Sequence, residues 1–410
     1  MYVAKHRGTK KAKTGIVVSV IFNIGLLVAF KYSGFIYENI NALFGTNLEI
    51  PSFTLPIGIS FYTFQSLSYV IDVYKGEVVA QKNIMKFYMF VSLYHQLVAG
   101  PIVRYQHIMH EIDNRKFNIK DISSGIHRFC IGLFKKVCIA NVAAEFVAKY
   151  MDGDIGALTT GEAWFGVIMF STQIYFDFSG YSDMAIGLGK MFGFHYHENF
   201  NYPYTANSAT DFWRRWHITL YVWLKNYLFD PLTLKFRNLG TTGILLAVMI
   251  TFLLSGFWHG ASITFIIWGL IHGTAICFDV FTRKSREKLS AKLPGWLFSF
   301  IQIFITFHIV AVSFIFFKSP DLYTALDIIN GALSVNFGLF GKWYAVYSAP
   351  FIMMIAGFLL QFIPESFGEK VIEVSGRLNW VVKAAAFAVL IIIIYQVVGR
   401  QQVPFIYLEF

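Results

Sequence analysis

The sequence predicts an all-α polytopic membrane protein, a helical bundle with about ten membrane segments. Hydrophobic residues fill 56% of the 410 positions and charged residues only 14%, whereas a soluble domain usually carries about 25% charged residues. A soluble chain of this composition would lack the polar surface needed to cover its core. Because backbone groups in lipid must be hydrogen-bonded within their own segment, each crossing is expected to be a helix.

Long uncharged runs support this class. The runs 15–30, 298–317, 343–364 and 384–399 each approach the roughly 17–25 residues that cross a bilayer as a helix. The run 238–278 is long enough for two crossings, and a break is expected near Gly256–Ser262.

The hydrophobic segments follow one another along the whole chain. They lie near 15–31, 53–73, 84–103, 124–150, 162–190, 241–257, 261–281, 296–317, 345–363 and 381–398. Three of them, 53–73, 84–103 and 162–190, contain polar residues that a purely lipid-facing anchor does not need. We therefore expect buried helices around a cavity, with some segments re-entrant or interfacial.

Positive charge is concentrated in short polar segments. The formal net charge is +10. Basic residues cluster beside apolar runs at Lys5, Arg7, Lys10, Lys11 and Lys13, and again at Arg283, Lys284, Arg286 and Lys288. Such clusters indicate cytoplasmic loops under the positive-inside rule. We therefore expect a basic cytoplasmic segment at 1–14 and one transmembrane domain at 15–410, and we do not expect nucleic acid as a partner.

His259 lies in the middle of the longest uncharged run, within Ser255–Ala261, and glycines flank the Trp258-His259 pair. A polar group inside an apolar run is energetically costly and asks for a reason. The glycines allow a bend and a close backbone approach. Two interpretations stay open from the residues alone: a catalytic histidine facing a cavity, or a core histidine bonded to a neighbouring helix.

His217 is the second candidate. A helix is expected to start at Ser208, because Ser208 and Asp211 form an S-x-x-D capping pattern, and to run through His217. Trp213 and Arg214 would then share the helical face of His217, and Asp211 would pair with Arg215. The other interpretation is an aromatic and basic belt that only anchors the helix at the interface.

Two acidic residues, Asp177 and Asp183, occur in an apolar context. They are compatible with a proton path in a transporter or with ion pairs to Arg214 or Arg215. The three cysteines lack metal-ligand spacing, so no metal site is expected. The P-loop, HExxH, GxSxG and dinucleotide motifs are all missing, so an enzyme of this sequence would use a histidine base in a membrane pocket.

Several motifs in the same order resemble the membrane-bound O-acyltransferase (MBOAT) family, most closely the alginate O-acetyltransferase membrane subunit and related polysaccharide O-acetyltransferases. Two hallmarks carry the resemblance, Trp258-His259-Gly260 and the stretch from Asp211 to Leu220. Further matching stretches are 56–65, 96–104, 180–189 and 198–204. The resemblance implies an MBOAT-type helical bundle around a central funnel or tunnel. It also implies that the family's first membrane segments are missing here.

By this resemblance, His259 is the essential catalytic residue and His217 its partner. The supporting or substrate-binding residues would be Trp258, Trp213, Arg214, Arg215, Trp216 and Asp211. The expected general base is His259, which removes the proton of an acceptor hydroxyl. His217, or a nearby Arg or Trp N–H, would stabilise the oxyanion or orient the acceptor. A thioester donor such as acetyl-CoA is already activated, so no bound cofactor or metal is needed.

The implied function is transfer of an acyl group, most simply acetyl, from a cytoplasmic thioester across the membrane. The acceptor would be a hydroxyl in cell-surface polysaccharide, such as alginate or another exopolysaccharide. Implied partners are membrane lipid, an extracytoplasmic SGNH-type acyltransferase and a polysaccharide synthase complex, at the bacterial cytoplasmic membrane. The alternative is a transporter or flippase for a polysaccharide precursor, with Asp177, Asp183 and the histidines as its polar path.

Overall fold

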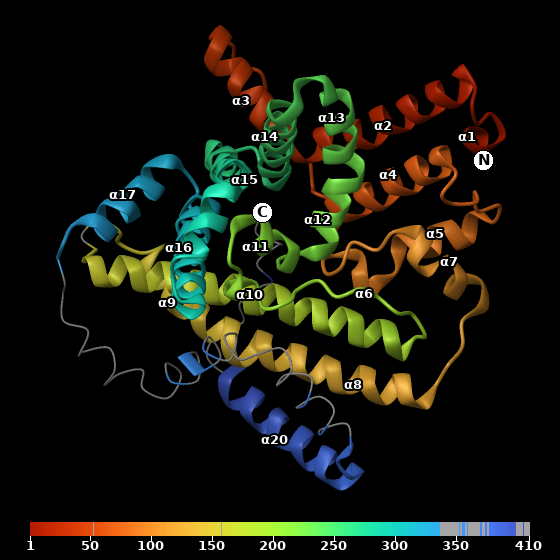
Figure 1. Cartoon of the computed structure of the whole chain (residues 1–410). Helices are drawn as coiled ribbons and strands as arrows, with labels where there is room; N and C mark the ends of the chain where they lie inside the picture. Colours follow the sequence, from red (N-terminus) through yellow and green to blue (C-terminus); the bar gives the residue numbers. More distant parts are fainter. Residues whose placement is uncertain are drawn as a thin grey trace.

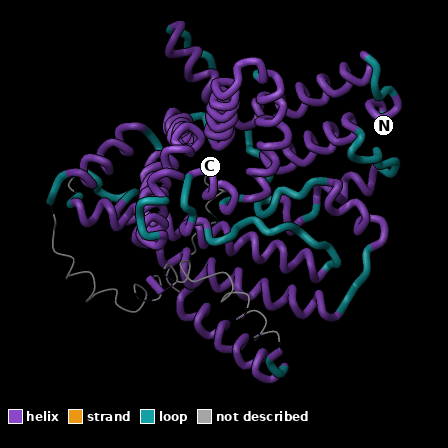
Figure 2. Tube along the Cα trace, viewed as in Figure 1, coloured by secondary structure: helices purple, strands orange, loops and turns teal. Residues whose placement is uncertain are grey.

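The structure is a computed structural model that describes residues 1–51, 53–156, 158–336 and 377–398, and the positions 352, 355, 356, 359, 370, 374 and 405. The described residues are predominantly helical and contain no strand, as Figure 2 shows. The predicted all-α class is therefore confirmed for this part of the chain.

The helices of the first half are α1 (Tyr2–Lys5), α2 (Lys10–Lys31), α3 (Ser33–Phe44), α4 (Ile59–Lys75), α5 (Ile84–Ser92), α6 (Tyr94–Leu97), α7 (Tyr105–Asn114), α8 (Ile119–Phe134), η1 (Lys135–Ala140), α9 (Asn141–Tyr150) and α10 (Thr160–Met191). Those that follow are η2 (Pro203–Thr205), α11 (Ala209–Arg215), α12 (Ile218–Leu224), η3 (Lys225–Phe229), α13 (Asp230–Lys235), η4 (Arg237–Leu239), α14 (Gly240–His259), α15 (Ile263–Ser290), α16 (Gly295–Lys318), α17 (Leu322–Leu333) and α20 (Trp380–Val398).

Four helical stretches in the described part are long and apolar enough to cross a membrane: Lys10–Lys31, Arg237–His259, Ile263–Ser290 and Gly295–Lys318. They coincide with α2, η4 joined to α14, α15, and α16, where the sequence predicted crossings. The chain is therefore a multi-pass membrane protein.

The other predicted segments have mixed outcomes. The segments 53–73, 124–150, 162–190 and 381–398 are mainly helical, in α4, α8 to α9, α10 and α20. Most of 345–363 lies outside the described residues.

The predicted segment 84–103 is not one continuous helix. Helix α5 ends at Ser92, α6 covers a single turn, and residues 98–104 are not helical. Gly100 adopts a φ of 103°, which an L-residue with a side chain rarely adopts, and Pro101 has no N–H for a helical bond. The segment is therefore interrupted by its own backbone chemistry.

Helices α8 and α10 run side by side (Figure 1), and their backbones meet at glycines. A Cβ added at Gly132 would collide with the carbonyl oxygen of Gly180, and one added at Gly125 would collide with that of Gly187. Small residues of this kind allow close packing of apolar helices, where dispersion contacts provide the attraction. In the view of Figure 1, this helix pair lies beneath α11 and α12, and α14 and α15 lie higher still.

The two aspartates of α10 form ion pairs with basic residues of the neighbouring elements. The carboxylate of Asp177 lies 2.7 Å from the Lys136 ammonium, and that of Asp183 lies 2.7 Å from both Lys135 and Arg128. The suggested pairing with Arg214 or Arg215 is therefore wrong. The basic partners come from α8 and η1 because these elements pack directly on α10.

Candidate active site

His259 is the last residue of α14, and its side chain is only 5% exposed. Gly260 is extended, and Ser262 then caps α15 by accepting a hydrogen bond from the backbone N–H of Thr264. The predicted break near Gly256–Ser262 is confirmed. The helix ends at the histidine instead of bending around it, so the ring projects from a helix terminus.

Helices α14 and α15 approach closely behind this terminus. A Cβ at Gly256 would meet the carbonyl oxygen of Phe265, and a Cβ at Gly269 would meet that of Phe252. The glycines therefore let the backbone of α15 pack against the turn that carries His259.

Two consecutive residues hold the end of α14: Lys31, the last residue of α2, and Tyr32, which follows it. The Lys31 ammonium donates to the carbonyl oxygens of Trp258 and His259, at 3.0 and 2.7 Å. The Tyr32 hydroxyl donates to the carbonyl oxygen of Phe257 at 2.6 Å. A helix leaves its last four carbonyls unbonded, and a cation near its negative end is favourable. No local pattern in the sequence indicates this role of Lys31, because its partners lie 227 and 228 positions away.

The prediction that His217 shares a helix with Trp213 and Arg214 is wrong. Ser208 caps α11 as expected, accepting a hydrogen bond from the N–H of Asp211 at 3.1 Å, but α11 ends at Arg215. His217 follows in the left-handed region, with φ 43° and ψ 54°, and α12 begins at the next residue. Such a conformation is uncommon for a residue with a side chain, and it interrupts the helical path between Arg215 and Ile218.

A cavity of about 180 Å³ opens beside His259. Its polar lining includes Lys31, Ser60 and His259, and Trp258 forms part of its wall. The remainder is contributed by 55–59, Phe61 and Val98.

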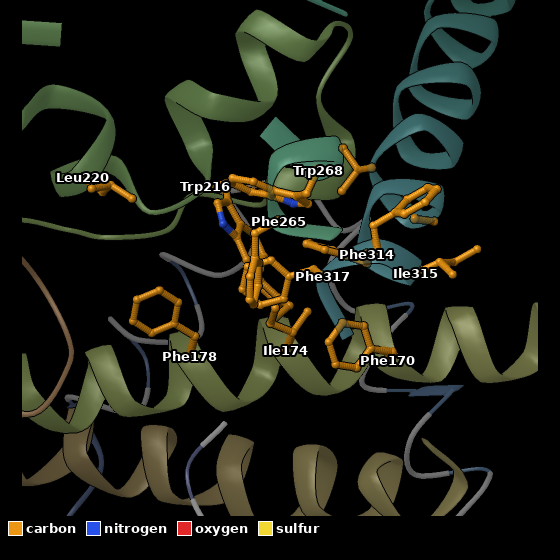
Figure 3. Close-up of a cluster of buried hydrophobic side chains, with 14 of the residues drawn as sticks. Phe170, Ile174, Phe178, Trp216, Leu220, Phe265, Trp268, Phe314, Ile315 and Phe317 are labelled. Carbon is orange, nitrogen blue, oxygen red and sulfur yellow. The ribbon is translucent and has the colours of Figure 1, made fainter. Parts of the chain in front are cut away.

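A second, much smaller cavity of about 10 Å³ is lined by both candidate histidines. Its remaining lining is hydrophobic or aromatic: Ile174, Trp213, Trp216, Leu220, Trp268, Phe314 and Phe317. Figure 3 shows Trp216, Trp268, Phe314 and Phe317 of this group gathered above Ile174 of α10. His259 therefore borders both cavities, and the smaller one has the size of about one water molecule.

The predicted supporting residues separate into two groups. Trp213 and Trp216 line the small cavity, and Trp258 lines the large one. Arg214 is exposed, and Arg215 pairs with Asp211 at 3.0 Å as predicted. None of these three charged residues lines either cavity.

One further residue belongs to the site although no local pattern in the sequence points to it. Trp268 lines the small cavity, and its indole N–H is buried without a hydrogen-bond partner among the described residues. The Trp213 indole N–H instead donates to Nδ1 of His272 at 3.2 Å. His272 also contacts Ser313 Oγ at 3.0 Å and is buried in the core.

The family model described as "MBOAT, membrane-bound O-acyltransferase family" matches residues 78–317. This range includes both hallmark histidines and more than half of the chain. The chain belongs to the membrane-bound O-acyltransferase family. The MBOAT match includes α14 and α15 and nearly all of α16.

Individual MBOAT relatives carry names of three related kinds. A probable alginate O-acetylase of Pseudomonas syringae pv. tomato is 39% identical over 340 residues, which are 82% of this chain and 62% of that protein. A peptidoglycan O-acetyltransferase of Helicobacter pylori is 33% identical, covering 78% of this chain and 65% of that protein. A teichoic acid D-alanyltransferase of Bacillus subtilis is 27% identical, covering 65% and 69%. The chain thus spans slightly less than two thirds of the first two relatives.

Proposed function

We propose that this chain is the catalytic core of a membrane O-acyltransferase that forms an ester on a hydroxyl of cell-surface polysaccharide. One observation carries the proposal: His217 and His259, from different elements, line the same buried cavity. The names of the relatives support transfer of a small acyl group, since two of the three kinds are O-acetyl-transferring proteins.

The proposed donor is acetyl-CoA or another acyl thioester, supplied from the cytoplasmic side of the bacterial inner membrane. His259 acts as the general base that removes the proton of the acceptor hydroxyl, whose oxygen then attacks the thioester carbonyl. The thiolate leaves and takes up one proton, so the products are an ester and a free thiol. A tryptophan N–H stabilises the oxyanion of the tetrahedral intermediate.

The two cavities suggest how the substrates are divided. The 180 Å³ cavity is large enough for an acetyl group and part of its carrier. The small cavity is large enough for little more than a hydroxyl or a water. We propose that the acyl donor occupies the former, beside Lys31, and that the reacting hydroxyl enters the latter.

The proposed partners follow from the same pathway. An extracytoplasmic SGNH-type acyltransferase would take over the acyl group, and a polysaccharide synthase complex would supply the polymer. The final acceptor would be alginate or another exopolysaccharide.

The test is an assay of purified protein with acetyl-CoA, in which free thiol and acetylated acceptor are measured. His259→Ala is expected to lower the rate to background, since general base catalysis contributes about 10²–10⁴-fold. The matched control is His308→Ala, because His308 is a partly buried histidine of α16 that lines neither cavity. A well-folded His259→Ala protein with the wild-type rate would disprove the catalytic role.

A further inference from the structure

The segment that begins at Asn199 lies against the turn that carries His217. The backbone N–H of Ile218 donates to the carbonyl oxygen of Asn199, and that of Asn201 donates to the carbonyl oxygen of Arg215, each at 2.9 Å. The Asn199 side chain is 1% exposed and lies 3.0 Å from Nδ1 of His217. Two segments without regular secondary structure are thereby held together at the candidate site.

The orientation of the Asn199 amide is determined by its other contacts. Its Oδ1 faces the backbone N–H of Thr219 at 3.3 Å, a group that can only donate. The Thr219 hydroxyl contacts the same oxygen at 2.8 Å, while the Asn199 amide nitrogen donates to Ser182 Oγ at 3.1 Å. The atom that faces His217 is therefore the amide oxygen.

This orientation determines the tautomer of His217. Because Oδ1 can only accept, Nδ1 of His217 must carry the hydrogen, and in the neutral ring Nε2 must then carry the lone pair. Nε2 is buried and has no hydrogen-bond partner among the described residues. The ring lines the small cavity together with His259. A proton-accepting nitrogen is thus available at the cavity that both histidines share.

We propose that Asn199 is a positioning residue that holds His217 as a proton acceptor for His259. The proposal rests on the proposed function. The acceptor hydroxyl gives its proton to one nitrogen of His259. His259 then passes the hydrogen of its other nitrogen to Nε2 of His217. His217 becomes an imidazolium that still donates from Nδ1 to Asn199, and the proton finally goes to the departing thiolate.

The same geometry defines what His217 does not do. A neutral His217 with its hydrogen on Nδ1 has no donor at Nε2, so before the proton arrives it does not polarise the thioester carbonyl from that nitrogen. Of the donors named in the sequence analysis, a tryptophan N–H remains. The Trp268 indole N–H is the unpartnered donor that lines the same cavity.

The first experiment reads the tautomer directly and does not depend on activity. Protein labelled with ¹⁵N-histidine is examined by NMR at neutral pH, and the His217 signals are assigned from their loss in His217→Gln. The expected wild-type spectrum shows hydrogen on Nδ1. An Nε2-protonated or evenly mixed ring would overturn the proposal, whether or not the protein is an acyltransferase.

The second experiment compares two replacements of the amide. Asn199→Leu removes the acceptor of the Nδ1 hydrogen. It is expected to lower kcat about 100-fold and to change KM less than about threefold. This is the scale expected when a catalytic imidazole loses its orientation. Asn199→Asp keeps an oxygen acceptor and is expected to restore kcat to within about tenfold of wild type, because the Nδ1 hydrogen is again accepted.

The matched control is Asn41→Leu, because the side-chain amide oxygen of Asn41 also accepts from a backbone N–H and a threonine hydroxyl, but Asn41 lies on α3 and lines neither cavity. It is expected to leave the rate unchanged. Equal losses in Asn199→Leu and Asn199→Asp, with both proteins folded, would contradict positioning. If instead wild type itself releases no thiol, the proposed function fails while the NMR result still decides the tautomer.

Discussion

The side-chain nitrogen of Lys31 lies 2.7 Å from the carbonyl oxygen of His259, although the two residues are 228 positions apart in the chain. The contact joins the end of the first membrane helix to the end of α14. It holds the backbone of the proposed base at a helix terminus, and it places an ammonium group in the lining of the larger cavity.

Lys31→Met is expected to lower both stability and the acyl-transfer rate. The carbonyl oxygens of Trp258 and His259 lose a charged donor, and such hydrogen bonds contribute about 1.5–3 kcal/mol each. Melting temperature and initial rate measure the two effects. Lys75→Met is the control, because Lys75 also ends a helix but is exposed and lines neither cavity. An unchanged rate in folded Lys31→Met would show that the ammonium only supports the fold.

Trp268→Phe is expected to lower kcat by about 10²–10³ with little change in KM, which is the effect of removing one donor from an oxyanion site. Phenylalanine keeps much of the aromatic surface and loses only the indole N–H and the second ring. Steady-state kinetics with acetyl-CoA measure this, with Trp164→Phe of α10 as a control outside both cavities. A kcat within threefold of wild type would remove Trp268 from the mechanism.

Gly132→Ala is expected to destabilise the pair of α8 and α10 by about 1–3 kcal/mol, the usual cost of overpacking. The added Cβ would collide with the backbone of Gly180, which cannot move without shifting a helix. Thermal unfolding in detergent measures the loss. Gly25→Ala in α2 is the matched control, because a Cβ there meets nothing within 4 Å. Equal melting temperatures for the two variants would contradict the close helix contact.

Asp183→Asn is expected to reduce stability because it leaves Arg128 and Lys135 without their shared carboxylate. Breaking a buried pair costs about 3–5 kcal/mol, an upper limit here because the two basic side chains are 24% and 25% exposed. Asp113→Asn, which breaks an exposed pair with Lys86, should cost less than about 1 kcal/mol. If Asp183→Asn stays fully stable and stops transport of a precursor, the transporter interpretation gains support.

Parts of the candidate site were predictable because their signals are local in sequence. Glycines beside Trp258 and His259 indicated the helix break, and the Ser208 cap and the Asp211–Arg215 pair follow from spacings of three and four residues. The course of the chain after Arg215 was not predictable in this way. Backbone bonds from residues 199–201 hold His217 in a left-handed conformation that overrides the local helical pattern.

The sequence by itself determined that this protein is helical and crosses a membrane, because apolar runs of sufficient length have no other stable arrangement in lipid. It also singled out His259, since a polar residue in such a run is costly. Only the tertiary structure decided which groups surround His217 and His259. Lys31, Asn199 and Trp268 come from separate elements, and their hydrogen-bond partners and cavity neighbours are set by long-range packing that leaves no local pattern in the chain.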